Sequence, residues 1–375
     1  MPTHTDQPLD YASAGVDTAA GDKAVELMKA AVSRTMNTSV IGATGGFAGL
    51  VDASLMKDMK QPLLATSTDG VGTKIAIAQA MDIHDTIGQD LVGMVVDDIV
   101  VVGAKPLFMT DYIACGHVIP ERIAAIVTGV ARALEQVDCP LVGGETAEHP
   151  GVMAPDDYDI AGAATGVVDA GRMLGAERVK PGDVLVGMDA SGLHSNGYSL
   201  VRRVVEVSGS HLEDPVADFG RTLGEELLEP TRLYTSVCLE LLNTLGVEGL
   251  HALSHVTGGG IGANLARVIP AGLDATVERG TWRVPPVFTW VSQAGSVSWE
   301  ALEDSLNLGI GMIAVVASHH VDEAIRTIRA SGINAHVLGD VTLSNAPIPA
   351  DARVISGTKG VHGGAVRLVG HYRAS

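Results

Sequence analysis

The chain has 375 residues, of which 46% are hydrophobic but only 3% aromatic, and it carries a formal net charge of −19. This length predicts two domains, and the aliphatic composition favours α/β cores. The negative charge argues against nucleic acid and anionic membranes as partners. No apolar run is long enough to span a bilayer, and the polar N-terminus does not resemble a secretory signal. We therefore expect a cytoplasmic protein.

The three cysteines support the same localisation. Cys115, Cys139 and Cys238 are too few and too widely spaced for a disulfide framework or a zinc cluster. We expect all three to be reduced residues of the core.

The first half of the chain alternates helical and strand patterns. Apolar residues at helical spacing predict a packing helix, and a segment that begins with Pro120 predicts an amphipathic one. The predicted elements are helices at 22–34, 88–102 and 120–137 and strands at 62–65, 140–142 and 159–168. The helix at 120–137 is interpreted as scaffold.

The helix at 88–102 carries three acids among apolar residues. Asp90 and Asp97 are seven residues apart and share one face, with Asp98 beside them. Burying them requires a cation or hydrogen-bond donors as compensation. The alternative is that they face solvent at the rim of the helix.

A polar segment at 170–180 predicts the domain boundary, giving an N-terminal domain at 1–172 and a C-terminal domain at 173–342. In the second half we expect a strand at 184–188 and helices at 230–245, 262–268 and 321–330. Residues 343–375 show no clear periodicity and are interpreted as a tail.

The most informative motif occupies residues 68–74, after the strand at 62–65. Asp69 is suited to a divalent cation, Gly70, Gly72 and Thr73 to the approach of an anion, and Lys74 to phosphoryl oxygens. The motif lacks the pattern of a P-loop. The alternative interpretation is an ordinary glycine turn at the end of a strand.

Three further acids belong to this chemistry. Asp97, Asp98 and Glu145 lie in or beside strand-end or glycine-rich segments, as Asp69 does. Converging carboxylates of this kind bind Mg²⁺, which bridges to phosphate oxygens. Gly143 and Gly144, which precede Glu145, are candidate contacts of the nucleotide.

The second half contains two polar or glycine-rich loops ahead of helices. His194, Ser195 and Asn196 open one helix, and Gly258, Gly259 and Gly260 precede another. Such helix starts offer N–H groups to an anion, and His194 is a candidate proton acceptor or donor, although a lone histidine is more often structural. The segment 309–314 matches G-x-G-x-x-A but continues as a strand, which excludes a Rossmann dehydrogenase.

These segments together resemble the phosphoribosylformylglycinamidine cyclo-ligase family, also called aminoimidazole ribonucleotide synthetases. The resemblance extends from Tyr11 to about Gly339, and it rests on the motifs at 14–17, 68–74, 84–88, 143–148, 194–200, 258–260 and 307–312.

The resemblance implies an aminoimidazole ribonucleotide synthetase-like fold with two α/β (α+β) domains. In it the N-terminal domains of a homodimer form a β-barrel-like core, with the ATP site near that interface. The implied reaction converts formylglycinamidine ribonucleotide and ATP into aminoimidazole ribonucleotide, ADP and phosphate through an iminophosphate, with Mg²⁺ and often K⁺.

By the same resemblance, Asp69, Asp98 and Glu145 would hold Mg²⁺, and Lys74 would meet the triphosphate. The loop with Gly45 and Gly46 would fold over the nucleotide. Asp69, Lys74 and His194 are the predicted catalytic residues. The loops at 194–196 and 258–260 would face the substrate.

Some residues depart from the family pattern, and other functions share the fold. Asp97 stands where Asn is common, Lys105 where Glu is common and His149 where Met is common. A thiamine-monophosphate kinase and a non-catalytic nucleotide-binding regulator remain alternatives. A selenophosphate synthetase is disfavoured because the first cysteine is Cys115.

Overall fold

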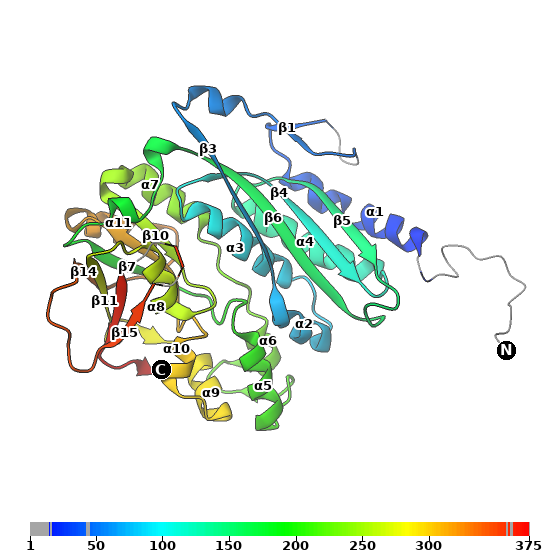
Figure 1. Cartoon of the computed structure of the whole chain (residues 1–375). Helices are drawn as coiled ribbons and strands as arrows, with labels where there is room; N and C mark the ends of the chain where they lie inside the picture. Colours follow the sequence, from blue (N-terminus) through cyan, green and yellow to red (C-terminus); the bar gives the residue numbers. More distant parts are fainter. Residues whose placement is uncertain (1–14, 16, 43–45, 358, 361–362, 375) are drawn as a thin grey trace, which may run out of the picture.

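The computed structural model describes residues 15, 17–42, 46–357, 359–360 and 363–374. It has two α/β halves that lie side by side (Figure 1). A continuous cluster of buried aliphatic residues runs through both, and it includes Val95 of the first half and Ile313 of the second. Among the described residues, no helix is both long and apolar enough to cross a membrane.

The N-terminal half is a four-stranded sheet with the order β3-β6-β4-β5. Its β6 is antiparallel to both neighbours, whereas β4 and β5 are parallel. Figure 1 shows α1, α3 and α4 on one face of the sheet. Its elements are α1 (Thr18–Thr35), β1 (Val40–Ile41), β2 (Leu50–Val51), β3 (Pro62–Gly70), α2 (Ile75–Met81), α3 (Ile87–Val100), β4 (Lys105–Cys115), α4 (Pro120–Gln136), β5 (Leu141–Glu148) and β6 (Tyr158–Asp169).

The predicted elements of this half are present, but β3 and β5 are longer than expected. The strand β3 continues through Asp69 to Gly70. The strand β5 is extended in the same way. It continues from Leu141 through the glycine-rich segment to Glu148, because residues 143–148 pair with Thr110–Cys115 of β4. A Cβ atom on Gly144 would lie 1.9 Å from Oδ1 of Asp111, so a larger residue here would force that carboxylate to move. The segment is therefore an edge strand and not a turn.

The C-terminal half is a seven-stranded sheet with the order β10-β13-β7-β14-β11-β16-β15. Helices α7 and α11 pack on it through a second cluster of buried residues, which includes Cys238 and Ile328. Its elements are β7 (Val184–Asp189), α5 (Tyr198–Ser208), β8 (Pro215–Val216), β9 (Arg221–Thr222), α6 (Leu223–Leu227), α7 (Thr235–Gly249), β10 (Leu250–His255), α8 (Gly260–Leu265), β11 (Leu273–Glu278), β12 (Arg283–Val284), α9 (Pro286–Gly295), α10 (Trp299–Glu303), β13 (Ile310–Val316), α11 (Val321–Ala330), β14 (Ala335–Leu343), β15 (Arg353–Ser356), β16 (Ala365–Val369) and β17 (Arg373–Ala374).

Residues beyond 342 do not form a tail. The strand β16 pairs with β11 and β15 inside the large sheet, and β17 pairs with β12. Val366 and Leu368 are buried. The strands are too short for their periodicity to stand out, and their stability comes from partners almost a hundred residues earlier in the chain.

The acids of α3 join the two halves. Asp90 accepts hydrogen bonds from the backbone and hydroxyl of Thr231, and Asp97 accepts them from Tyr234 N and Thr235 Oγ1. Both acids are fully buried, and burial raises the pKa of Asp97 to about 6. Hydrogen-bond donors therefore compensate Asp97, whereas Asp90 is compensated at Oδ1 by Thr231 and also by the ammonium of Lys74. The two acids hold residues 231–235 in place, so α7 begins at Thr235 and not at residue 230.

The expectation for the cysteines is confirmed. Cys115, Cys139 and Cys238 are all buried and none forms a disulfide.

Candidate functional site

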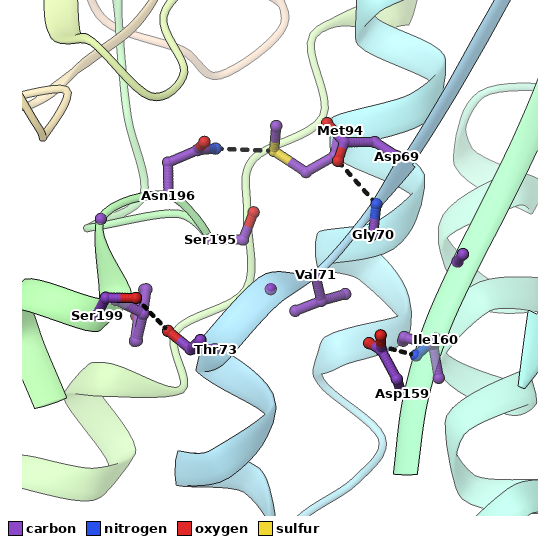
Figure 2. Close-up of a pocket in the computed structure, with 14 residues that line it drawn as sticks. Asp69, Gly70, Val71, Thr73, Met94, Asp159, Ile160, Ser195, Asn196 and Ser199 are labelled. Carbon is purple, nitrogen blue, oxygen red and sulfur yellow. Dashed lines mark hydrogen bonds between the residues drawn. The ribbon is translucent and has the colours of Figure 1, made fainter. Parts of the chain in front are cut away.

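A pocket of about 500 Å³ lies where the two halves meet (Figure 2). One wall is the end of β3 with the turn after it, and the other is the loop that leads into α5. Its lining residues are Asp69, Gly70, Val71, Gly72, Thr73, Met94, Asp159, Ile160, Ala161, Ser195, Asn196, Gly197, Tyr198 and Ser199. Both walls carry segments that the sequence predicted to bind ligands.

The first wall places a carboxylate beside a glycine turn. Asp69 accepts a hydrogen bond from Gly70 N at 2.8 Å, and Gly72 takes a left-handed backbone conformation with φ of 69°. Burial raises the pKa of Asp69, and the nearby charge of Asp98 adds to this effect. A cation would relieve this repulsion between carboxylates.

The second wall is stabilised by the backbone conformation of its loop and by a hydrogen bond from a neighbouring loop. Gly197 has φ of 79° at the start of α5, and Asn196 Oδ1 accepts a hydrogen bond from Gly258 N at 2.9 Å. The two polar loops of the second half are therefore in direct contact. Across the pocket, the hydroxyls of Thr73 and Ser199 lie 3.3 Å apart, as Figure 2 shows.

Lys74 does not face this pocket. Its side chain is fully buried, and its ammonium donates to Asp90 Oδ1 at 2.9 Å, to the carbonyl of His194 at 3.0 Å and to that of Glu229 at 2.6 Å. An ammonium has three protons, and all three are used. Burial lowers the pKa of Lys74, and the charge of Asp90 opposes that effect. The structure thus corrects our expectation of a mobile cation at the triphosphate.

The ring of His194 is also turned away from the pocket. The residue is 2% exposed, and its Nε2 accepts from Ser191 N at 3.3 Å. Burial, assisted by the charges of His255 and Lys74, moves the pKa of His194 well below its usual value. Its Nδ1 has no hydrogen-bond partner among the described residues. The expected role in proton transfer at the pocket is therefore not supported by this arrangement.

A histidine that the sequence analysis missed contacts one of the predicted acids. His255, at the end of β10, lies 2.9 Å through Nδ1 from Asp98 Oδ1. Burial acts to lower the pKa of His255, but the hydrogen bond to Asp98 and the charges of Asp97 and Asp69 raise it overall. In the sequence, His255 lies shortly before the glycine loop 258–260. This position could have identified it as a candidate site residue.

Glu145 is separated from Asp69. The two lie on opposite edge strands of the sheet, three strand spacings or about 14 Å apart. Asp69 is coupled to Asp98 on the helix-covered face, whereas Glu145 is the cross-strand neighbour of Tyr112, whose exposed side chain lies on the open face. Within one chain, Asp69, Asp98 and Glu145 therefore do not form a common metal site.

The glycines expected at the nucleotide or at the substrate lie in different places. Gly143 and Gly144 are on β5 with Glu145, and Gly46 is exposed between β1 and β2. Gly45 lies outside the described residues. Gly258, Gly259 and Gly260 lead into α8 beside Asn196.

The sequence matches two family models across most of its length. They are AIR synthase related protein, N-terminal domain, over residues 51–168, and AIR synthase related protein, C-terminal domain, over residues 180–348. The phosphoribosylformylglycinamidine cyclo-ligase of Alkaliphilus oremlandii is 45% identical over 334 residues, which cover 89% of this chain and 97% of that protein. The cyclo-ligase of Shouchella clausii is 45% identical over 92% of this chain and 98% of that protein.

The chain belongs to the phosphoribosylformylglycinamidine cyclo-ligase family. This confirms the resemblance seen in the sequence and makes the chain a ligase that forms a carbon–nitrogen bond.

Solved structures confirm the two-domain fold of the cyclo-ligase family. Escherichia coli HypE, a hydrogenase maturation protein, matches with a TM-score of 0.62 at 18% identity over 95% of this chain and 94% of its own. Thiamine-monophosphate kinase from Stenotrophomonas maltophilia matches with a TM-score of 0.57 at 18% identity over 91% and 95% of the two chains. A HypE structure in complex with ATP matches with a TM-score of 0.57 at 18% identity over 90% of each chain.

Proposed function

We propose that the chain converts formylglycinamidine ribonucleotide and ATP into aminoimidazole ribonucleotide, ADP and phosphate in purine biosynthesis. The observation that carries the proposal is the pocket between the two halves, bounded by Asp69–Thr73 on one side and Ser195–Ser199 on the other. Membership of the cyclo-ligase family supplies the reaction class. A protein of the same fold has been solved with ATP, which supports ATP as the nucleotide.

Asp69 and Asp98 are the residues of this chain that fit a magnesium ion. Mg²⁺ is usually held by one or two carboxylates together with phosphate oxygens and water, and these two acids are electrostatically coupled. The ion would neutralise phosphate charge. Among the described residues, no group of three His, Cys, Asp or Glu side chains is arranged around a common point. Glu145 would join the site only from a second copy of the chain.

The reaction needs phosphate as a leaving group. The formamide oxygen of the substrate attacks the γ-phosphorus, ADP leaves, and an iminophosphate remains. The amidine nitrogen then attacks the formyl carbon of the iminophosphate. This step closes the five-membered ring and expels phosphate. The protein contributes mainly by positioning the two reactants and stabilising charge. Ser195 and Asn196 face the pocket and are the proposed substrate contacts, with Gly258 held beside them.

The open face of the N-terminal sheet supports the proposed homodimer. The described helices pack on the opposite face, whereas Leu64 is 65% exposed and Tyr112 is 41% exposed. A mixed sheet with apolar residues on an uncovered face needs a partner layer to remove them from water. A second copy of the same sheet supplies that layer.

The direct test is turnover by the purified protein. We expect ADP release from Mg²⁺-ATP only when formylglycinamidine ribonucleotide is present, with one aminoimidazole ribonucleotide formed per ADP. ADP release with thiamine monophosphate instead would replace the proposal with a kinase. Tight ATP binding without release in either mixture would indicate a regulator.

A further inference from the structure

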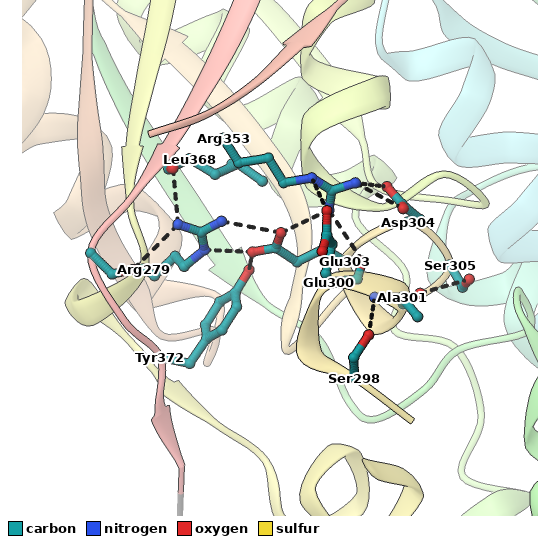
Figure 3. Close-up of polar contacts among 11 residues, drawn as sticks. Arg279, Ser298, Glu300, Ala301, Glu303, Asp304, Ser305, Arg353, Leu368 and Tyr372 are labelled. Atoms are coloured by element: carbon teal, nitrogen blue, oxygen red, sulfur yellow. Dashed lines mark hydrogen bonds and ion pairs between the residues drawn. The ribbon is translucent and has the colours of Figure 1, made fainter. Parts of the chain in front are cut away.

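Figure 3 shows residues near the C-terminus in contact with a buried carboxylate of α10. Glu303, the last residue of α10, is 4% exposed. Arg279 donates to both of its carboxylate oxygens, Arg353 of β15 donates to Oε2 at 2.9 Å, and Tyr372 Oη donates to Oε1 at 2.7 Å. We call Arg279, Glu303, Arg353 and Tyr372 the C-terminal latch.

Arg353 of the latch also contacts two carboxylates outside it. It donates to both carboxylate oxygens of Asp304, at 2.7 and 2.8 Å, and its Nε lies 3.6 Å from Glu300 Oε1, so two guanidinium groups meet three carboxylates. Burial acts to raise the pKa of Glu303, but hydrogen bonds from Arg279, Tyr372 and Arg353 outweigh it and leave that pKa below its usual value. A buried carboxylate with this many charged donors has one well-defined orientation.

The latch ties the last strands to α10. Arg279 Nη1 donates to the carbonyls of Leu368 at 2.9 Å and Gly370 at 3.2 Å. The ring of Tyr372 packs against Trp282 and Trp299, with centroid distances of 5.6 and 5.4 Å. Arg353 and Tyr372 therefore hold the C-terminal end of α10 from two directions.

The turn that follows Glu303 supports both proposed substrate loops. A Cβ atom on Gly260 would lie 1.9 Å from the carbonyl oxygen of Glu303, and one on Gly197 would lie 2.3 Å from Leu306 Cδ2. Asn307 Nδ2 donates to the carbonyl of Gly192 at 3.0 Å. Because the turn packs against both loops and is hydrogen-bonded to one of them, we expect a displacement of this turn to displace the loops.

We propose that the C-terminal latch positions the loops 192–197 and 258–260, so that Arg353 and Tyr372 are positioning residues for substrate binding. Residues 353–372 lie beyond the matched C-terminal family domain, which ends at residue 348. The inference rests on the proposed function in one respect, namely that these loops bind formylglycinamidine ribonucleotide. A loop that is displaced by about 1 Å is enough to weaken binding and turnover substantially.

The test uses the full-length variants Arg353→Gln and Tyr372→Phe, with Arg203→Gln as the control. Arg203 forms an exposed ion pair with Glu206 within α5 and does not contact the latch. We expect faster amide hydrogen exchange in peptides covering 192–197 and 258–261 of both latch variants. The KM for formylglycinamidine ribonucleotide should rise about tenfold or more, while the KM for ATP changes by less than about twofold. The control should match the parent protein in all three measurements.

Two results would overturn the positioning role. One is unchanged exchange and KM in both latch variants. The other is faster exchange throughout the C-terminal half, including α7 and β13, because that pattern means general destabilisation. If the parent protein does not turn over formylglycinamidine ribonucleotide, the proposed function fails, and the exchange measurement alone decides whether the latch positions the loops.

Discussion

The ammonium of Lys74 lies 2.9 Å from the carboxylate of Asp90, and neither side chain is exposed to solvent. Lys74 is bonded in addition to the carbonyls of His194 and Glu229 in the second half of the chain. A motif that the sequence analysis assigned to phosphate binding thus contributes its lysine to the junction between the two halves. Asp69, Gly70, Gly72 and Thr73 of the same motif remain in the pocket.

Removal of Lys74 should destabilise the protein. Lys74→Met leaves the carboxylate of Asp90 buried without its cation, so the free energy of unfolding should fall by about 3–5 kcal/mol. Urea denaturation measures this loss, and the double variant Lys74→Met/Asp90→Asn should recover most of it. Lys23→Ala, which breaks an exposed pair with Glu121, is the control and should leave the midpoint nearly unchanged. A fully stable Lys74→Met protein would contradict the assignment.

Asp111 should make stability depend on pH. Burial raises its pKa to about 7, from an ordinary value of 3.8. Because the folded state binds this proton more tightly than the unfolded state, the stabilisation is complete below about pH 4 and is lost as the pH rises through about 7. Asp111→Asn should remove this decline, which is on the order of a few kcal/mol. Thermal unfolding between pH 4 and 8 tests it, and an unaltered slope in the variant would refute it. Asp322→Asn, an exposed acid on α11, should keep the parent slope.

Asp69 and Asp98 should control nucleotide affinity. Asp69→Asn and Asp98→Asn should each weaken the binding of Mg²⁺-ATP by roughly ten- to hundredfold, as expected when a charged contact of about 1.5–3 kcal/mol is lost. Titration calorimetry with and without Mg²⁺ measures the effect. Asp85→Asn is a suitable control because Asp85 pairs with Arg132 at the surface. Parent-like affinity in both site variants would remove the two acids from the nucleotide site.

Leu64 should be required for dimerisation. Leu64→Glu puts a charge on the open face of the sheet, and burying it in a dimer would be costly. We expect the parent protein to have the mass of a dimer by light scattering and the variant that of a monomer. Leu27→Glu changes a similarly exposed leucine on α1 and should remain dimeric. A monomeric parent protein would argue against the dimer itself.

Local patterns in the sequence were sufficient for most of the elements. The predicted helix at 321–330 has the same bounds as α11, and the helix at 88–102 corresponds to α3. Helical periodicity and the residues that start and stop helices depend on neighbours within a few turns. They can therefore be recognised in the sequence without knowledge of the fold. The short strands β15 and β16 could not, because β16 is stabilised by the distant strand β11 and β15 pairs only with β16.

Motifs and local periodicity were enough to predict the family, the two α/β halves and most segments that line the pocket. The directions in which their side chains face became visible only in the folded chain. Folding turned Lys74 toward a carbonyl 155 residues away, buried His194, and placed Glu145 on the far edge of the sheet from Asp69. A charged side chain takes the orientation in which its desolvation is compensated, and the compensating partners come from segments that only folding brings together.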